Sequence, residues 1–268
     1  MKRETIWSAL ALLGGLLFLW PVLQSIWMSF QTVDAYYGNR FSFTLDKYGQ
    51  AITQFHFLQY LVNSLIVSGT VTIAGLAAAT AAAFAFARFR FPGGNLLFGA
   101  VVATLMIPSH ITLIPNYLTL AQFNLLDTYA GLILPAIGNG FAAFFLRQYI
   151  RGIPRALDEA AYMDGATPLK VLWRVIVPIA RPAIFSMGLF IFLGEWNSYI
   201  WPLVAVGDDR LYTLQIGLSH LYKISPGEGL VDWPLVMAAS TVSLLPVILG
   251  FILVERHLVR GIAAGALK

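Results

Sequence analysis

Long apolar runs alternate with shorter polar segments along the chain. A helix that crosses a membrane needs about 20 mostly apolar residues, because hydrocarbon offers the backbone no hydrogen-bond partners. Six runs have that length, at about residues 6–30, 58–87, 96–123, 128–146, 182–206 and 234–254. The pattern predicts an all-α, polytopic membrane protein with six transmembrane helices in a single transmembrane domain, residues 1–268.

Several runs carry finer signals. Two prolines, Pro108 and Pro115, flank His110 in the third run and predict a bent or broken helix. We interpret His110 as a core hydrogen-bonding group, with a proton relay as the alternative. Asn63 and Ser64 in the second run are expected to join helices through hydrogen bonds. The small residues of 75–87 predict close helix packing.

The first run also has a second interpretation, a cleavable signal peptide. It is longer than the 7–15 apolar residues of a signal core, and no small-x-small cleavage site follows it. An uncleaved first span is therefore the favoured interpretation.

Composition agrees with a membrane protein. Hydrophobic residues make up 58% of the chain and charged residues 11%, against about 25% charged in soluble domains. The absence of cysteine excludes disulfides and thiolate chemistry, and the four histidines do not stand at metal-ligand spacing. We expect no metal, no cofactor bound by this chain and no nucleic-acid partner.

The positions of the basic residues predict the orientation. Of the 17 lysines and arginines, 13 fall in the segments on one side of the six runs and four on the other. Because cytoplasmic loops carry an excess of Lys and Arg, both termini and the loop at about 148–181 are expected in the cytoplasm. The loop at about 207–232 is then external.

The long cytoplasmic loop contains the signals of two short helices. Pro154 is suited to begin the first, and Asp158 and Glu159 complement the positive end of a helix in its early turns. Gly165 permits the positive φ that ends a helix. The first helix is therefore expected between Pro154 and Gly165.

The second helix has its own start signal. Thr167 can cap it, with Pro168 at its first position, and Pro178 is expected to break or bend the chain before the fifth span. Two roles remain open from these residues alone. The loop docks to a partner, or it lies along the headgroups with four apolar side chains in lipid, namely Leu169, Leu172, Trp173 and Ile176.

A known motif matches the same loop. In "EAAYMDGATPLKVLWRVIVP", Glu-Ala-Ala is followed after three residues by Gly, and nine residues later by Val-Ile-Val-Pro. This resembles the EAA motif of permease subunits in bacterial ATP-binding-cassette (ABC) importers, with valines for the usual Ile and Leu. The matching residues, to which Asp164 inside the motif is added, are Glu159, Ala160, Ala161, Asp164, Gly165 and Pro178.

Two further stretches resemble the carbohydrate-uptake branch of these importers, which includes the maltose and glycerol-3-phosphate systems. They are "EWNSYIWPL" in the fifth run and "RHLVRGIAAGALK" at the end of the chain. The resemblance implies a heterodimer with a second permease subunit, two separate ATPase subunits that bind ATP and Mg, and an external solute-binding protein. It also implies that the helix carrying Glu159 docks into the ATPase and transmits its closure to the spans.

The tail has two interpretations, and the external loop has one, which follows from the resemblance. The residues from Arg256 onwards anchor the sixth span by their charge, or reach between the ATPase subunits as the resemblance implies. The loop at 207–232 faces the binding protein and is a candidate for entering its sugar site.

Residues suited to a sugar lie in the fifth run. Aromatic rings stack on sugars, and amides or carboxylates bind hydroxyl groups, so Glu195, Trp196, Asn197 and Tyr199 are candidates for the substrate path. An ionisable side chain at membrane depth is a functional candidate by default. The competing interpretation places Glu195 at the outer interface, with Trp196 and Trp201 as aromatic-belt residues.

Catalysis in this chain is not expected. The sequence has no GxxxxGK[ST] motif, no HExxH and no paired carboxylates. A secondary transporter driven by an ion gradient is the alternative function, but that class usually shows repeated halves, and none is seen here. No Lys or Arg lies within the spans, which favours a neutral sugar or polyol over a phosphorylated one.

Overall fold

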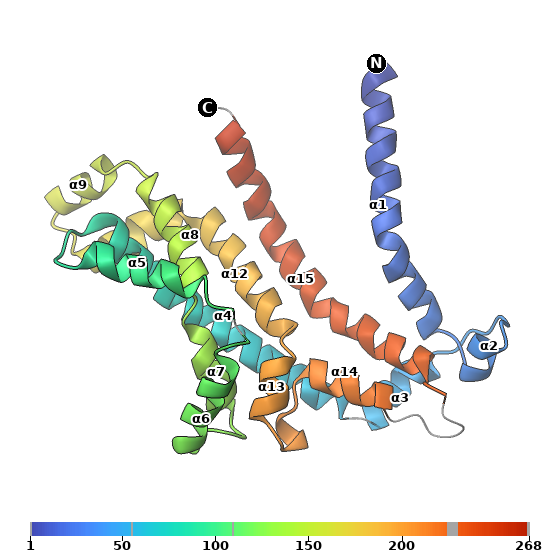
Figure 1. Ribbon diagram of the computed structural model, residues 1–268. Helices are drawn as coiled ribbons and strands as arrows, with labels where there is room; N and C mark the ends of the chain where they lie inside the picture. The colour runs from blue at the N-terminus through green and yellow to red at the C-terminus, as the bar shows by residue number, and fades with distance from the viewer. Residues whose placement is uncertain (1, 55, 109, 224–229, 267–268) are drawn as a thin grey trace. The chain divides into compact units, whose positions relative to one another are not determined.

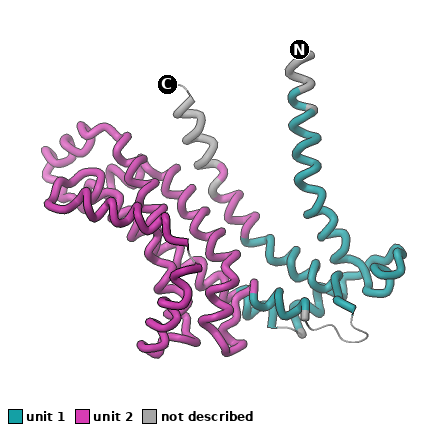
Figure 2. Tube along the Cα trace, in the orientation of Figure 1, with its two compact units in different colours: residues 1–61, 216–246 teal, residues 62–215, 247–268 magenta. Residues whose placement is uncertain are grey.

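Helices form every regular element of the computed structural model, in the part of the chain that it describes (Figure 1). It describes residues 2–54, 56–108, 110–223 and 230–266. Contacts divide the chain into two compact units (Figure 2). Unit 1 comprises residues 1–61 and 216–246, and unit 2 comprises residues 62–215 and 247–268.

Unit 1 consists of two chain segments that a buried ion pair joins. It contains α1 (Lys2–Ser29), α2 (Val33–Tyr37), α3 (Asp46–Gln54), most of α14 (Leu214–Lys223) and the first part of α15 (Trp233–Ala266). Lys47 of α3 donates to Asp232 just before α15, with Nζ and Oδ2 2.6 Å apart. This bond joins segments 185 residues apart in the sequence.

Unit 2 holds the remaining helices. Most of α4 (Phe57–Arg88) lies in it, followed by α5 (Gly94–Thr104), α6 (Leu113–Gln122), α7 (Tyr129–Ile137) and α8 (Gly140–Arg151). Next come α9 (Ala156–Met163), α10 (Pro168–Val171), the π-helical segment η1 (Leu172–Ile176) and α11 (Val177–Ile179). The unit continues with α12 (Arg181–Trp196), α13 (Ile200–Ala205) and the 3₁₀ segment η2 (Asp209–Leu211).

Small side chains line the core of unit 2 along α4. Ala79, Ala83 and Ala87 recur every fourth residue, so they share one face of the helix, and all three are buried. A Cβ at Gly75 would come within 3.2 Å of the Ile137 carbonyl oxygen. The close packing predicted for residues 75–87 is confirmed.

Asn63 and Ser64 fulfil the predicted joining role. The Asn63 amide donates to the carbonyl oxygens of Arg210 and Tyr212, both at 2.9 Å, and accepts from the Tyr129 hydroxyl at 2.7 Å. Ser64 Oγ accepts from the Leu214 amide at 2.8 Å. The start of α4 in unit 2 is thereby tied to α7 and to the segment between η2 and α14.

The predicted spans agree with the structure only in part. Among the described residues, α1, α4 and α15 each contain an apolar stretch long enough to cross a membrane. Two bent pairs, α7 with α8 and α10–α11 with α12, raise the number to as many as five. A polytopic all-α membrane protein is confirmed, whereas six separate spans are not.

The third predicted span is interrupted. It consists of the shorter helices α5 and α6, and the described residues between them, 105–108 and 110–112, are not helical. Pro108 lies in the break, where its missing N–H and its ring oppose a continuous helix. His110 is exposed in this turn, so its predicted place in the core is wrong.

The fourth and fifth predicted spans are also bent. α7 and α8 meet at 41° around Gly138, where Asn139 Oδ1 accepts from the Ala142 amide at 2.8 Å and caps α8. The helices from Pro168 to Ile179 and from Arg181 to Trp196 meet at 83°. This bend falls at Ala180, two residues after Pro178. The π-helical hydrogen bond from Val177 N to Leu172 O precedes it.

The segment expected as an external loop contains ordered structure. It includes η2 and the ten-residue helix α14, while residues 224–229 of the same loop lie outside the described residues. The tail from Arg256 continues α15 as far as Ala266. The side chains of that tail are likewise outside the described part.

Candidate coupling loop

Helix α9 forms where local signals predicted it. It begins two residues after Pro154, with Asp158 and Glu159 in its first turn. Gly165 has φ +77°, and the amides of Gly165 and Ala166 donate to Tyr162 O and Ala161 O, both at 3.0 Å. This pair of bonds is a Schellman motif, which satisfies the last carbonyls of the helix and needs a residue with positive φ. The role predicted for Gly165 in ending the helix is confirmed.

The following helix also starts as predicted. Thr167 Oγ1 accepts from the Lys170 amide at 3.4 Å, and Pro168 occupies the first turn of α10. Leu172 and Ile176 are buried in the core of unit 2, whereas Leu169 is exposed. The interpretation that placed Leu172 and Ile176 in lipid is wrong, because these side chains pack inside the protein.

Helix α9 has one anchored face and one exposed face. Asp158 is 5% exposed, and Ala161 packs against the core of unit 2. Glu159 and Ala160 are exposed, and Met163 is 88% exposed. The exposed face of α9 therefore carries the small side chain of Ala160 and the charged side chain of Glu159. Neither side chain is buried by the rest of the described chain.

A buried ion pair holds α9 in place. Arg88, the last residue of α4, lies 2.5 Å from Asp158, measured from Nε to Oδ2, and both side chains are at least nine-tenths buried. Arg88 Nη2 also donates to the Ile153 carbonyl oxygen at 3.0 Å. One guanidinium thus fixes the start of the loop and the first turn of α9 to the end of α4.

Sequence reasoning missed this pair. In the sequence, Arg88 is one of the basic residues that predict the orientation in the membrane, and Asp158 complements the positive end of a helix. Burial raises the pKa of the Asp158 carboxyl, and the neighbouring Arg88 charge acts in the opposite direction. In the described chain Asp158 Oδ1 has no hydrogen-bond partner. The only sequence signal that could have suggested the pair was that Arg88 follows the second apolar run and Asp158 lies in the loop predicted on the same side of the membrane.

A pocket of about 390 Å³ opens beside this pair. Its lining combines cationic, anionic and aromatic side chains at the base of α9 and includes Glu159. The lining residues are Arg88, Phe89, Arg155, Asp158, Glu159, Tyr162 and Pro168.

The residues predicted for a substrate path lie on another part of unit 2, near the end of α12. Trp196 is 2% exposed and stacks on Phe192, with ring centroids 5.6 Å apart. A belt position for Trp196 at a lipid surface is therefore wrong. Trp201 also packs inside, where its indole Nε1 donates to Gly131 O at 3.3 Å.

The other three candidates are neighbours of Trp196 in the sequence. Glu195 and Tyr199 are half-buried, and Asn197 is exposed, with its amide donating to Leu193 O at 2.8 Å. The described residues contain no cluster of three or more His, Cys, Asp or Glu side chains that could hold a metal.

Comparison with known proteins identifies the class. Residues 71–264 match the family described as the binding-protein-dependent transport system inner membrane component, and the chain belongs to that family. Among relatives, the sn-glycerol-3-phosphate transport system permease protein UgpE of Pectobacterium atrosepticum is 32% identical over 226 residues, covering 84% of this chain and 79% of UgpE. UgpE of Shigella flexneri serotype 5b is 34% identical over 206 residues, covering 77% of this chain and 73% of that UgpE.

Solved structures show the same fold. A bacterial ABC transporter for import of the acidic polysaccharide alginate has a chain with TM-score 0.81 and 23% identity, covering 94% of this chain and 95% of that chain. A chain of the alginate transporter in complex with the alginate pentasaccharide-bound periplasmic protein has TM-score 0.62 and 18% identity. The match covers 96% of this chain and 93% of that chain. The expected family, the ABC importer permeases of the carbohydrate-uptake branch, is confirmed, and the chain is a multi-pass inner membrane component.

Proposed function

We propose that this chain forms half of the translocation path of an ABC importer and is driven through α9 by a separate ATPase. The observation that carries the proposal is the division of α9 into two faces. Asp158 and Ala161 are held by the chain itself, while Glu159 and Ala160 of the EAA motif are exposed. A partner that pushes on the exposed face would move the bundle, because the other face is fixed to the end of α4.

The proposed assembly has two permease subunits, two ATPase subunits and an external solute-binding protein. The family's description as binding-protein-dependent supports the last of these. A structural relative solved with a substrate-bound periplasmic protein supports it further. ATP and Mg would bind to the ATPase, since this sequence lacks a phosphate-binding loop motif. Membership of the family disfavours the alternative of an ion-driven secondary transporter.

The proposed topology places α9 and both termini in the cytoplasm. The bias of lysines and arginines supports this orientation. Because the chain has no cysteine, single cysteines can report it in whole cells. Met163→Cys should react with a membrane-impermeant maleimide only after the membrane is opened, whereas exposed Phe41→Cys should react in intact cells. The reverse pattern would refute the orientation.

A sugar or related polyol is the proposed substrate class. Glu195, Trp196, Asn197 and Tyr199 remain candidates for the path, and their aromatic and polar types suit hydroxyl-rich solutes. A phosphorylated polyol is the second candidate, favoured by relatives named for sn-glycerol-3-phosphate. A thermal-shift screen of the partner binding protein with neutral sugars and with glycerol phosphate separates the two.

The coupling role is tested by two substitutions in α9 and its turn. Glu159→Lys reverses the exposed charge, and Gly165→Pro cannot adopt the observed φ of +77°. In proteoliposomes containing the whole importer, both should lower substrate-stimulated ATP hydrolysis and uptake at least about tenfold, equivalent to about 1.4 kcal/mol. Assembly in the membrane should persist.

A matched control reverses a charge elsewhere. Asp46→Lys changes an exposed carboxylate in the first turn of α3, outside the loop, and should leave coupling unchanged. Normal uptake by Glu159→Lys at normal expression would overturn the coupling role of α9.

A further inference from the structure

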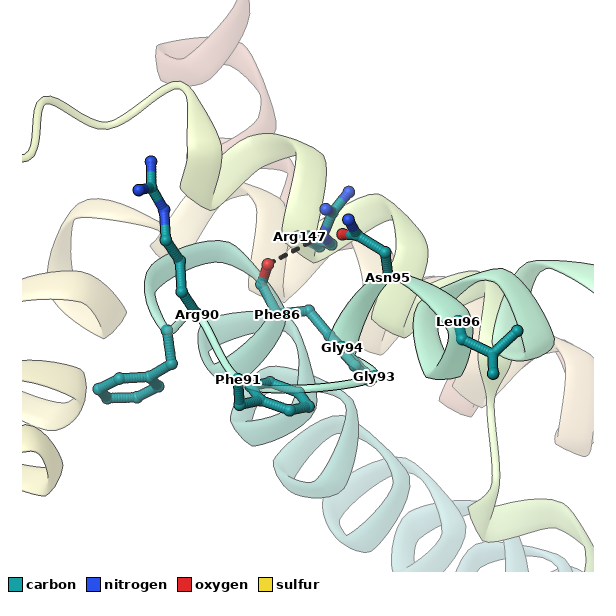
Figure 3. Close-up of a pocket in the computed structure, with 9 residues that line it drawn as sticks. Phe86, Arg90, Phe91, Gly93, Gly94, Asn95, Leu96 and Arg147 are labelled. Carbon is teal, nitrogen blue, oxygen red and sulfur yellow. Dashed lines mark hydrogen bonds between the residues drawn. The ribbon is translucent and has the colours of Figure 1, made fainter.

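A second, larger pocket of about 600 Å³ lies where α4 ends and α5 begins. Figure 3 shows it between the last turn of α4, the connection to α5 and one side of α8. Cationic, amide and apolar groups form its walls, and none of the lining residues is acidic. The lining residues are Phe86, Phe89, Arg90, Phe91, Gly93, Gly94, Asn95, Leu96 and Arg147.

Arg147 is held in a defined orientation at one wall. Its Nε donates to Phe86 O at 3.1 Å, and its guanidinium carbon lies 3.8 Å from the centroid of the Phe98 ring. These contacts use one of the five guanidinium N–H groups and one face of the plane. The terminal nitrogens point past the Asn95 side chain (Figure 3). A planar guanidinium fixed in this way suits recognition of an oxyanion.

Arg90 adds a second cation to the pocket lining. It lies in the exposed connection between α4 and α5. The ion pairs of the described residues, Lys47–Asp232 and Arg88–Asp158, include neither Arg90 nor Arg147. The pocket therefore carries two positive charges that no carboxylate of the described chain neutralises.

The backbone at the floor of the pocket is shaped by two glycines. Gly93 has φ +77°, and a Cβ at Gly94 would lie 3.2 Å from the ring of Phe91. A side chain at Gly94 would require the Phe91 ring to shift slightly. The tight turn brings Asn95, in the first turn of α5, to the same opening as the two arginines.

The rim of the pocket is apolar and exposed. Leu96 is 79% exposed, and Phe89 and Phe91 are 43% and 39% exposed. Leu96 belongs to α5, an apolar helix of eleven residues. A small soluble anion would use the arginines but not this rim, whereas an amphiphile with a charged head and hydrocarbon chains would use both.

We propose that this pocket binds the phosphate of an anionic phospholipid, with Arg147 and Arg90 on the phosphate and Leu96 beside the acyl region. The proposal rests on the basic, cytoplasmic side inferred for these segments, where basic residues attract anionic headgroups. It does not depend on the coupling role of α9.

The test measures lipid retained by the intact importer. Native mass spectrometry of the complex released from nanodiscs compares phosphatidylglycerol with phosphatidylcholine, in wild type and in single variants. Arg90→Gln and Arg147→Gln should each reduce retained phosphatidylglycerol, by about tenfold for Arg147, whose fork is pre-oriented. Arg147→Lys should fall between wild type and Arg147→Gln.

The matched control is Arg151→Gln, an exposed arginine one turn further along α8 and outside the pocket lining. It removes the same charge and should retain phosphatidylglycerol as wild type does. Arg90→Gln is expected to fold as wild type does, because the Arg90 side chain is exposed, so a loss of lipid in this variant reports on the pocket itself. Equal retention by all four variants would overturn the proposal.

Two further arms separate the alternatives. Inorganic phosphate at millimolar concentration should not displace phosphatidylglycerol, and displacement would assign the pocket to a soluble anion instead. Glu159→Lys should retain the lipid while losing coupling, so failure of the lipid site and failure of the proposed function give different results.

Discussion

The ion pairs Lys47–Asp232 in unit 1 and Arg88–Asp158 in unit 2 are both largely buried, but they are satisfied to different degrees. In unit 1, Lys47 bonds to Asp232 at 2.6 Å, and the other carboxylate oxygen of Asp232 accepts from the Leu235 amide at 3.0 Å as the cap of α15. In unit 2, Arg88 serves both Asp158 and Ile153 O, while Asp158 Oδ1 is left without a partner in the described chain. In unit 1 both members of the pair have a further hydrogen bond, since Lys47 Nζ also donates to Gln50 Oε1 at 3.3 Å. In unit 2 only Arg88 has one, to the Ile153 carbonyl oxygen.

This difference indicates different roles. A carboxylate that caps a helix and pairs with a lysine has used both oxygens, as expected of a structural clasp. A buried carboxylate with a spare oxygen keeps acceptor capacity beside the exposed Glu159. The pair in unit 2 therefore suits a joint that receives a partner, and the pair in unit 1 suits a closed connection.

The largest effect is expected from breaking the pair in unit 2. Asp158→Ala leaves the Arg88 charge buried without compensation, which typically costs about 3–5 kcal/mol. The purified importer should show a lower thermal unfolding midpoint and should lose substrate-stimulated ATP hydrolysis. The double variant Arg88→Met with Asp158→Leu removes both charges and should recover most of the midpoint but not the coupling. If the Asp158→Ala variant were as stable as wild type, the pair in unit 2 would have no measurable role in stability, and the comparison with unit 1 would fail.

A smaller effect is expected from breaking the pair in unit 1. Lys47→Met removes the cation, but Asp232 keeps its bond to the Leu235 amide, so a loss of about 2 kcal/mol is expected. Uptake driven by ATP should remain within about twofold of wild type at a temperature where the protein is folded, since less than 0.5 kcal/mol would separate the two. Lys170→Met, at an exposed lysine, is the control and should change neither quantity. Loss of coupling without loss of stability would contradict the structural role of this pair.

The smallest effect is expected at Asp127, whose carboxylate is held by backbone amides. Asp127 is exposed and accepts from the amides of Gly207 and Asp208 at 2.5 and 3.0 Å, bonds that lower the pKa of its carboxyl. Its stabilisation is therefore complete above the unfolded-state pKa and is lost as the pH falls through the lower folded-state pKa. Asp127→Asn should cost less than about 1 kcal/mol at pH 7, because the site is exposed to solvent.

Asparagine isolates the charge at this position. Asp127 has φ +54°, a conformation that asparagine tolerates well. The difference in unfolding midpoint between wild type and Asp127→Asn should shrink as the buffer is taken from pH 7 to pH 3. A difference that stays constant with pH would show that the charge contributes nothing.

Much of the coupling loop was predictable because its signals are local. Pro154, Gly165, Thr167 and Pro168 act on backbone angles and amides within a few residues, so their order predicted two helices and the turn between them. The three uninterrupted apolar helices α1, α4 and α15 were predictable for a similar reason. Their composition alone determines that hydrocarbon is a better environment for them than water.

The packing of the helices, and no local signal, fixes which face of α9 is anchored and which is exposed. Arg88 and the Ile153 carbonyl that it binds are 65 residues apart, and no local pattern connects them. The burial of Trp196 likewise depends on what packs against the end of α12. Composition indicated a membrane protein, a motif resemblance indicated its family, and short-range backbone preferences located the helix that we propose as the coupling helix. The ion pairs and the arginine-lined pocket came only from the fold, because side chains distant in sequence meet only after the helices have packed.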